Sequence, residues 1–297
     1  MVELPVETIR TLLHIVDGSL AFAGHYLHDG SHPVHTHSFV EVAVVVSGDG
    51  THHSLAGRQV LRPGDIMVLR PGVWHGYEDC HRLDVYNCCF STELLRRELA
   101  WTREDPQLGH LLWTGPFSGQ RRGILTAHLT GDAYAQCIEH LDGLRDLRGC
   151  SLSTHRGDFV GRLCLFLSGL ARAVAEADQV GGGPAEIHPA VLDAMRMMEE
   201  RPSHQWTLTE LAAGLHLAPG YLVRLFKAAT GLPPMAYLSR HRVELAAARL
   251  LHTDSPINRI GESVGWPDQN YFARRFKSHY GLSASTYRAR FTHTLKR

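Results

Sequence analysis

The stretch YLVRLFKAATGL, Tyr221–Leu232, returns fifty residues later as YFARRFKSHYGL, Tyr271–Leu282. The identities fall in register at Tyr221/Tyr271, Arg224/Arg274, Phe226/Phe276, Lys227/Lys277, Gly231/Gly281 and Leu232/Leu282. The repeated apolar residues recur at helical spacing, and the repeated Arg and Lys lie on another side of the same helix. A helix of this kind that occurs twice predicts a protein that reads two successive turns of DNA.

The first copy is predicted to be a helix-turn-helix unit. Its first helix, Thr207–Gly214, opens with a capping pattern formed by Thr207 and Glu210. Its second helix runs from about Pro219 to Thr230, with Pro219 in the first turn, where a missing N–H costs nothing. Gly231 ends this second helix.

The second copy repeats the plan. Its first helix is predicted at Ser255–Val264, with Ser255 as the cap, and its second at Asp268–Tyr280, ended by Gly281. The two units span about 207–231 and 256–281, and the long helix Pro234–His252 joins them. The second helices, called the reading helices below, are expected about 34 Å apart if they enter adjacent segments of the major groove.

The two reading helices differ where bases would be contacted. In the second copy the exposed positions of the N-terminal half are Gln269, Asn270, Ala273 and Arg274. In the first copy they are Pro219, Gly220, Val223 and Arg224. Gln and Asn pair with adenine and Arg pairs with guanine, so the second copy is expected to carry more sequence information. The plain alternative for either copy alone is a small helical hairpin with surface charges.

Charge and composition divide the chain. Residues 1–185 hold 15 Lys/Arg and 21 Asp/Glu, whereas residues 186–297 hold 15 and 9, and a basic C-terminal block favours attraction to phosphate. No membrane span and no secretory signal is expected, and the six cysteines show no CxxC pair, which favours a cytoplasmic protein. The predicted domains are 1–177 and 188–297, joined by a glycine-rich linker, 178–187.

The front domain is predicted to begin with short strands and to end with helices. Strands with turn signals between them are expected from about Ser19 to Phe90, which indicates a sandwich or barrel. Helical periodicity follows in Thr92–Leu99, Ala133–Leu147 and His155–Ala177. The last two helices either pack on the barrel or form a subunit interface, and the interface predicts a homodimer.

A cluster of histidines stands out in this front domain. In HPVHTHSFVE, His32–Glu41, the side chains of His35, His37 and Glu41 share one face if they lie on one regular strand. A later segment, Pro71–His75, brings Trp74 and His75 toward the same place across the barrel. Other histidines, such as His52, His53 and His128, are expected at the surface or in the core.

The C-terminal region resembles the DNA-binding domain of the AraC/XylS family of bacterial transcription regulators. The resemblance rests on Leu211-Ala212, Leu222, the run Arg224–Lys227, Gly231, Arg242, Ala246-Ala247, Arg249–Leu251, Ile257, Ile260, Val264, Gly265, Asp268–Phe272, Arg275–Lys277 and Ser283–Arg288. By this resemblance, Arg224 and Arg274 contact bases, and Gln269 and Asn270 contact bases or phosphate. Lys227 and Lys277 contact phosphate or cover the helix flank. Ala284 departs from the family, which more often has proline there.

The histidine segments resemble the two motifs of the cupin barrel. The resemblance implies a divalent metal, Fe(II), Mn(II), Zn(II) or Ni(II), on His35, His37, Glu41 and His75. Front domains of AraC-type regulators look like cupins used to sense ligands, often sugars, and usually without catalysis. Four interpretations stay open: an effector pocket without metal, a metal-assisted effector site, a catalytic metal site, and histidines that simply lie at the barrel mouth. In the first two, Trp74 joins the four residues as an effector contact.

Together these features predict an α+β chain with a cupin-like barrel in front and an all-α domain with two helix-turn-helix units behind. The expected function is regulation of transcription by promoter DNA binding under the control of a small effector, with no catalysis. RNA polymerase is an expected further partner. The alternative is a metal-dependent cupin enzyme with an accessory helical domain.

Overall fold

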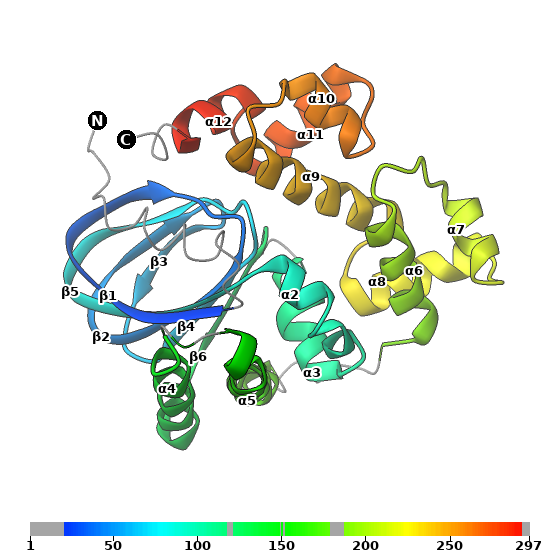
Figure 1. Ribbon diagram of the computed structural model, residues 1–297. Helices are drawn as coiled ribbons and strands as arrows, with labels where there is room; N and C mark the ends of the chain where they lie inside the picture. The colour runs from blue at the N-terminus through cyan, green and yellow to red at the C-terminus, as the bar shows by residue number, and fades with distance from the viewer. Residues whose placement is uncertain (1–20, 118–120, 149, 151, 179–186, 293–297) are drawn as a thin grey trace. The chain divides into compact units, whose positions relative to one another are not determined.

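A computed structural model describes residues 21–117, 121–148, 150, 152–178 and 187–292 (Figure 1). It divides into two compact units, one made mainly of residues before position 185 and the other mainly of residues after it. The predicted linker, 178–187, lies almost wholly outside the described residues. The limits of the two domains, 1–177 and 188–297, therefore stay a prediction.

The front unit is built on an antiparallel sheet of six strands that curls on itself (Figure 1). The strands are β1 (Ala21–His35), β2 (Val40–Ser54), β3 (Gly57–Leu61), β4 (Asp65–Leu69), β5 (His75–Phe90) and β6 (Ile124–His128). They pair in the order β1-β5-β2-β4-β6, and β3 pairs with β2. The long strands β1, β2 and β5 enclose an interior with buried Val85, Tyr77 and Met67, among others.

Helices follow the sheet, as the change of period predicts. They are α2 (Thr92–Arg96), η1 (Ala100–Arg103), α3 (Pro106–Gly109), η2 (His110–Thr114), η3 (Gly115–Phe117), α4 (Gly131–Arg145) and α5 (Leu152–Asp178). The apolar stripe of α5 is buried, including Leu163, Phe166 and Leu170. Among the described residues, no helix has the length and apolar character that a membrane span needs.

The rear unit contains seven described helices. They are α6 (Pro189–Glu200), α7 (Leu208–Gly214), α8 (Pro219–Thr230), α9 (Pro234–His252), α10 (Ile257–Ser263), α11 (Gln269–Tyr280) and α12 (Ala284–Thr292). The pairs α7/α8 and α10/α11 are the two helix-turn-helix units, and α9 connects them (Figure 1). The fold class is therefore as predicted.

The ends of these helices follow the capping signals in four of five cases. Thr207 accepts a hydrogen bond from the N–H of Glu210 (3.1 Å), and Asp268 accepts one from Tyr271 (2.8 Å). Both reading helices, α8 and α11, end at a left-handed glycine, Gly231 and Gly281. The prediction for Ser255 was wrong. Helix α10 begins at Ile257, so its N-cap residue is Pro256, whose side chain makes no capping hydrogen bond.

Candidate effector cavity and DNA-reading helices

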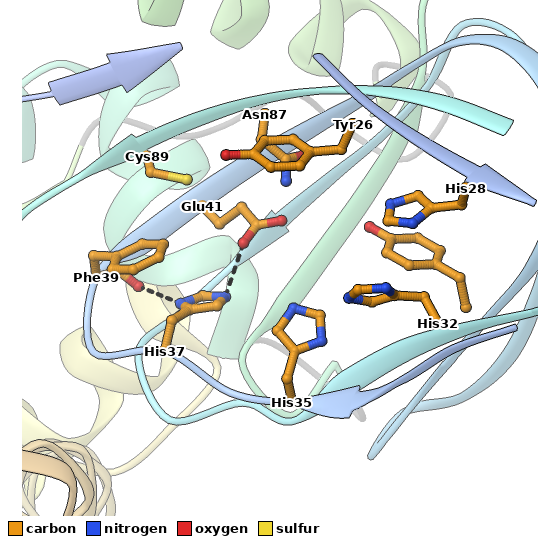
Figure 2. A pocket seen from close by; sticks show the side chains of 10 residues that line it. Tyr26, His28, His32, His35, His37, Phe39, Glu41, Asn87 and Cys89 are labelled. Carbon is orange, nitrogen blue, oxygen red and sulfur yellow. Dashed lines mark hydrogen bonds and ion pairs between the residues drawn. The ribbon is translucent and has the colours of Figure 1, made fainter. Parts of the chain in front are cut away.

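A cavity of about 50 Å³ lies inside the curled sheet (Figure 2). It is lined by Tyr26, His28, His32, His35, His37, Phe39, Glu41, Tyr77, Asn87 and Cys89. These residues come from β1, β2 and β5 and from the corner between β1 and β2. A space of this size holds an ion and a few waters, and is smaller than the pockets that usually take drug-sized ligands.

His35 and His37 do not lie on one strand, contrary to the premise of the sequence argument. His35 is the last residue of β1, whereas His37 lies in the corner before β2, which begins at Val40. The corner is held by two hydrogen bonds to the Pro71–His75 segment. The N–H of Gly72 donates to the carbonyl of His37 (2.8 Å), and the hydroxyl of Thr36 donates to that of Val73 (3.0 Å).

The structure nevertheless brings together the four residues predicted to bind a metal. Nε2 of His35 lies 2.8 Å from Nε2 of His75, and Nε2 of His37 lies 3.1 Å from a carboxylate oxygen of Glu41. His37, Glu41 and His75 each offer a ligand atom within 4.8 Å of the others, and all three are buried. In Figure 2, His37 and Glu41 face each other across the cavity, beside His35.

Backbone carbonyls fix how two of these imidazoles are protonated. Nδ1 of His35 donates to the carbonyl of Pro33 (3.1 Å), and Nδ1 of His37 donates to that of Phe39 (2.9 Å). In a neutral imidazole the second nitrogen then carries a lone pair. Both lone pairs, on Nε2, are directed into the cavity. Nε2 of His37 faces an oxygen of Glu41 at 3.1 Å, and either a proton on Nε2 or a bound cation makes this contact favourable.

Burial keeps the neighbouring imidazoles uncharged. Burial lowers the pKa of His35 to about 3 and that of His52 to about 4, and it holds the pKa of His75 well below its usual range. Burial raises the pKa of Glu41, but the surrounding imidazoles, His37 above all, more than offset this and lower it. At neutral pH, His35, His52 and His75 are thus neutral nitrogen ligands beside the carboxylate of Glu41.

Several buried polar atoms around the cavity have no hydrogen-bond partner among the described residues. They are Nε2 of His52, Nδ1 of His75, the hydroxyl of Tyr77 and Oδ1 of Asn87. A buried polar atom without a partner costs about 1 to 3 kcal/mol. Four such atoms around one cavity indicate that it is built to surround something polar.

Sequence reasoning missed part of this lining. His28 and His32 are four residues apart on β1, and Asn87 and Cys89 are two apart on β5, so alternation along the strands could have found them. His52, which lies behind the lining residue Tyr77 with ring centroids 5.6 Å apart, could not be found in this way. It is an odd number of residues from Glu41, and only the irregular pairing of β2 with β5 between Val45 and Thr51 turns it inward.

Two predicted effector contacts, Trp74 and His75, are not among the residues that line the cavity, but His75 reaches the lining residue His35 whereas Trp74 does not. Trp74 directly precedes His75 at the start of β5, and successive side chains of a strand point to opposite faces. Because His75 points inward, Trp74 points away, and its ring packs edge-on against His53 at 5.4 Å.

The predicted DNA contacts lie on the outer faces of α8 and α11. Most are exposed, namely Gly220, Arg224, Lys227, Gln269, Asn270, Arg274 and Lys277, and Val223 is half-buried. The opposite faces are buried through Leu222 and Phe226 on α8 and through Phe272 and Phe276 on α11. Each reading helix also places its Arg beside a Tyr ring: Arg224 is 5.6 Å from Tyr221, and Arg274 is 5.9 Å from Tyr271.

Comparison with known proteins identifies both units. An AraC-like ligand binding domain model matches residues 19–140, and a helix-turn-helix domain model matches residues 211–290. The chain belongs to the AraC family. Its AraC-like domain contains the histidine cavity, and its helix-turn-helix region contains both reading helices.

Relatives of this AraC-family chain are transcription regulators. A putative AraC-like transcription regulator from Streptomyces antibioticus is 34% identical over 37% of this chain, and the RCS-specific transcriptional activator RclR from Escherichia coli is 31% identical over 35%. In both, the match spans only 37% of the relative's own length. The transcriptional activator RhaS from Klebsiella pneumoniae is 24% identical, over 84% of this chain and 85% of its own.

A solved structure shares the whole fold. ToxT from Vibrio cholerae covers 92% of this chain and 100% of its own, with a TM-score of 0.54 and 13% identity. At this identity the likeness concerns the fold alone. The cupin enzyme alternative finds no support in these comparisons.

Proposed function

We propose that this AraC-family chain binds promoter DNA through its two helix-turn-helix units and that a small effector bound in the front cavity controls this binding. The observation that carries the proposal is the division of each reading helix. One face of α8 and α11 is buried in the domain, while the other presents an Arg side chain on both helices, and two amide side chains on α11, to solvent. Such a helix fits the major groove and can hydrogen-bond base edges.

The DNA contacts proposed on α8 are Gly220, Val223, Arg224 and Lys227, and those on α11 are Gln269, Asn270, Arg274 and Lys277. The reading helix α11 carries more of the sequence specificity, because Gln269 and Asn270 have no hydrogen-bonding counterpart on α8. The two lysines act mainly on phosphate. Selection of duplexes from a random pool by the purified protein tests this, and recovery of no preferred sequence would contradict it.

A divalent metal fits the cavity, and we propose that His35, His37, Glu41 and His75 hold it. The fit rests on the inward lone pairs of His35 and His37 and on the carboxylate of Glu41, since nitrogen and carboxylate ligands suit Zn(II), Ni(II), Mn(II) or Fe(II). The carbonyls of Pro33 and Phe39 orient the two imidazoles, as outer-shell partners do in metal sites. A bound metal would supply the positive charge between His37 and Glu41 and an open position for an effector.

The effector proposed for this cavity is a small polar molecule that contacts the four ligand residues or the metal they hold. The described cavity is smaller than a sugar needs, so a sugar would require lining side chains such as His28 and Tyr26 to move. Without metal, the unpaired atoms of His52, Tyr77 and Asn87 would hydrogen-bond the effector directly. Elemental analysis of the purified protein separates the two forms of the site.

The remaining partners follow from this role. We propose that the chain acts as a binding protein rather than an enzyme, that it works in the cytoplasm, and that it contacts RNA polymerase at promoters. A homodimer through α4 and α5 is proposed from the exposed Leu165, an apolar side chain on the outer face of α5. Sedimentation of Leu165→Glu against the natural protein tests the dimer, and an unchanged mass would contradict it.

A further inference from the structure

Arg242 lies in the middle of the connecting helix α9 and is buried. Its Nε donates to the carbonyl of Pro202 (2.7 Å), and its Nη2 donates to the carbonyl of His204 (2.6 Å). Both carbonyls belong to the loop between α6 and α7, which leads into the first helix-turn-helix unit. The guanidinium therefore ties α9 to the entrance of the first unit through two charge-assisted hydrogen bonds.

The other side of the same guanidinium packs on the turn of the second unit. Its Cζ lies 5.8 Å from the centre of the Trp266 ring. A Cβ atom added to Gly265 would lie 2.7 Å from Cζ and 2.8 Å from the carbonyl oxygen of Pro202. Gly265 thus allows the turn between α10 and α11 to touch Arg242 and the first unit's loop at once.

A second side chain joins the same two segments directly. Nε2 of Gln205, in the loop before α7, donates to the carbonyl of Gly265 in the turn before α11 (2.9 Å). Gln205 is exposed, so this bond closes the contact from the solvent side. The loop before the first unit and the turn of the second are therefore joined once through a buried charge and once at the surface.

We infer that Arg242, Gln205 and Gly265 form an interunit clamp that fixes the orientation of α11 relative to the first helix-turn-helix unit. The inference rests on the proposed function, in which α8 and α11 read one DNA site together. The three are positioning residues, since they act on DNA only through the helices they hold. The chemistry agrees with this role, because a planar guanidinium can bond two carbonyls and present its face to a third group, whereas an ammonium cannot.

A fixed orientation matters because the two units bind the same duplex. When one unit is bound, the other is presented to its half-site at an effective concentration that depends on how rigidly the two are joined. A loose joint lowers that concentration and also tolerates half-sites at other spacings. The clamp should therefore determine how much affinity is gained when both units bind, and which spacings between the two half-sites are tolerated.

The first test measures the free protein and needs no DNA. Spin labels carried by unnatural amino acids are placed at Ala228 and Ser278, which are exposed and occupy equivalent positions on α8 and α11. The distance distribution between them is measured by pulsed electron resonance in the full chain. We expect a narrow distribution in the natural protein and a broader or displaced one in Arg242→Lys and in Gln205→Ala.

The matched control is Arg249→Ala. Arg249 lies on the same helix, but its side chain bonds Ser263 of the second unit and no part of the first. Its loss should leave the distribution unchanged. Equal distributions in the natural protein, Gln205→Ala and a folded Arg242→Lys would overturn the clamp. Because Gln205 is exposed, its variant is expected to fold even if Arg242→Lys does not.

The second test uses a duplex that the natural protein selects from a random pool. On this duplex we expect Gln205→Ala and Arg242→Lys to lose about tenfold in affinity, and to lose less than the natural protein when one base pair is inserted between half-sites. On single half-sites their affinity should stay within about twofold of the natural protein. An unchanged spacing dependence would contradict the clamp, whereas failure of the natural protein to select any sequence would contradict the proposed function itself.

Discussion

His216 and Gly265 hold the same position in the two helix-turn-helix turns, and both have left-handed backbone, with φ of 55° and 95°. Each follows directly after the residue that ends the first helix, Leu215 in the first unit and Val264 in the second. The turn therefore requires this conformation in both units, but only the second unit supplies glycine. A residue with a Cβ is strained there, whereas glycine is not.

His216→Gly should stabilise the rear unit. Left-handed backbone costs a residue with a Cβ about 1 to 2 kcal/mol, and the greater freedom of glycine in the unfolded chain returns about 0.5 to 1 kcal/mol of this. A net gain of about 0.5 to 1 kcal/mol is expected, measured by urea unfolding of the full chain. Gly265→Ala is the opposite change and should destabilise the unit, because its Cβ would also press on Arg242. A loss of stability in His216→Gly would refute the strain at this turn.

Metal content tests the proposed ligand set. Protein purified without chelator should carry about one divalent metal per chain, and His37→Ala should lose it. The control is His53→Ala, which removes a histidine that pairs with Glu78 outside the cavity. Removal of the metal from the natural protein should lower its melting temperature, while the melting temperature of His37→Ala should not respond to chelator. Metal in equal amount in both variants would place the ion elsewhere.

Contacts of α11 with base edges should be distinguishable from its contacts with phosphate by their effects on DNA binding. Arg274→Ala should weaken binding to the selected duplex by about 1 to 3 kcal/mol and relax the preference at one base pair. Lys277→Ala, on the same helix, should weaken binding to all sequences alike and reduce the salt dependence by about one counterion. An equal loss for Arg274→Ala on random and selected DNA would argue against base contact.

Arg224→Ala should have a smaller effect on sequence preference than the combined variant Gln269→Ala/Asn270→Ala. The reason is that α8 offers one strong hydrogen-bonding base reader, whereas α11 offers three. Selection from a random pool with each variant measures the change at every position of the site. Equal loss of information in the two half-sites would show that the units contribute alike.

Buried thiols should make the front unit sensitive to alkali. Burial raises the pKa of Cys137 from 9.0 to about 12 and raises that of Cys88 as well. In the unfolded chain these thiols ionise near pH 9, so above this pH the folded state holds more protons and stability falls as pH rises. Each thiol contributes a loss of up to about 1.4 kcal/mol per pH unit. Urea unfolding between pH 8 and pH 10.5 measures the slope.

The variant for this measurement is Cys137→Ala, which should reduce the slope even though it lowers stability at neutral pH. The matched comparison is Cys150→Ala, which leaves the four buried thiols in place. If the free energy of unfolding falls with pH at the same rate in all three proteins, other groups cause the loss of stability at alkaline pH.

The rear unit could be predicted from the sequence nearly in full, because its signals are local. Helical period, the Thr207 and Asp268 caps and the glycines at 231 and 281 each act within a few residues. The error at Ser255 shows the limit of such signals, since Pro256 follows it and the helix begins only after the proline. The clamp around Arg242 could not be predicted, because its partners are about 40 residues away in sequence.

The front unit was predictable in outline and less so in detail. The candidate ligands meet as expected, although His35 and His37 reach the cavity from a strand end and a corner rather than from one strand. Glu41 lies where parity predicted, although the strand that this argument assumed is interrupted by the corner before Val40. Parity fails for His52, because irregular pairing of β2 with β5 changes the face of its side chain. Strand β6 was missed, since its five residues lie among helices and pair with β4 across a long loop.

The exposed side chains of α11 have one more consequence. Gln269, Asn270 and Arg274 lie on the exposed face of the helix, so the buried core does not constrain their identity. A descendant of this gene could exchange them, and so acquire new target promoters, without first having to survive an unstable intermediate. The buried residues that α8 and α11 share would be inherited unchanged, and regulatory networks could diverge through changes in a few codons.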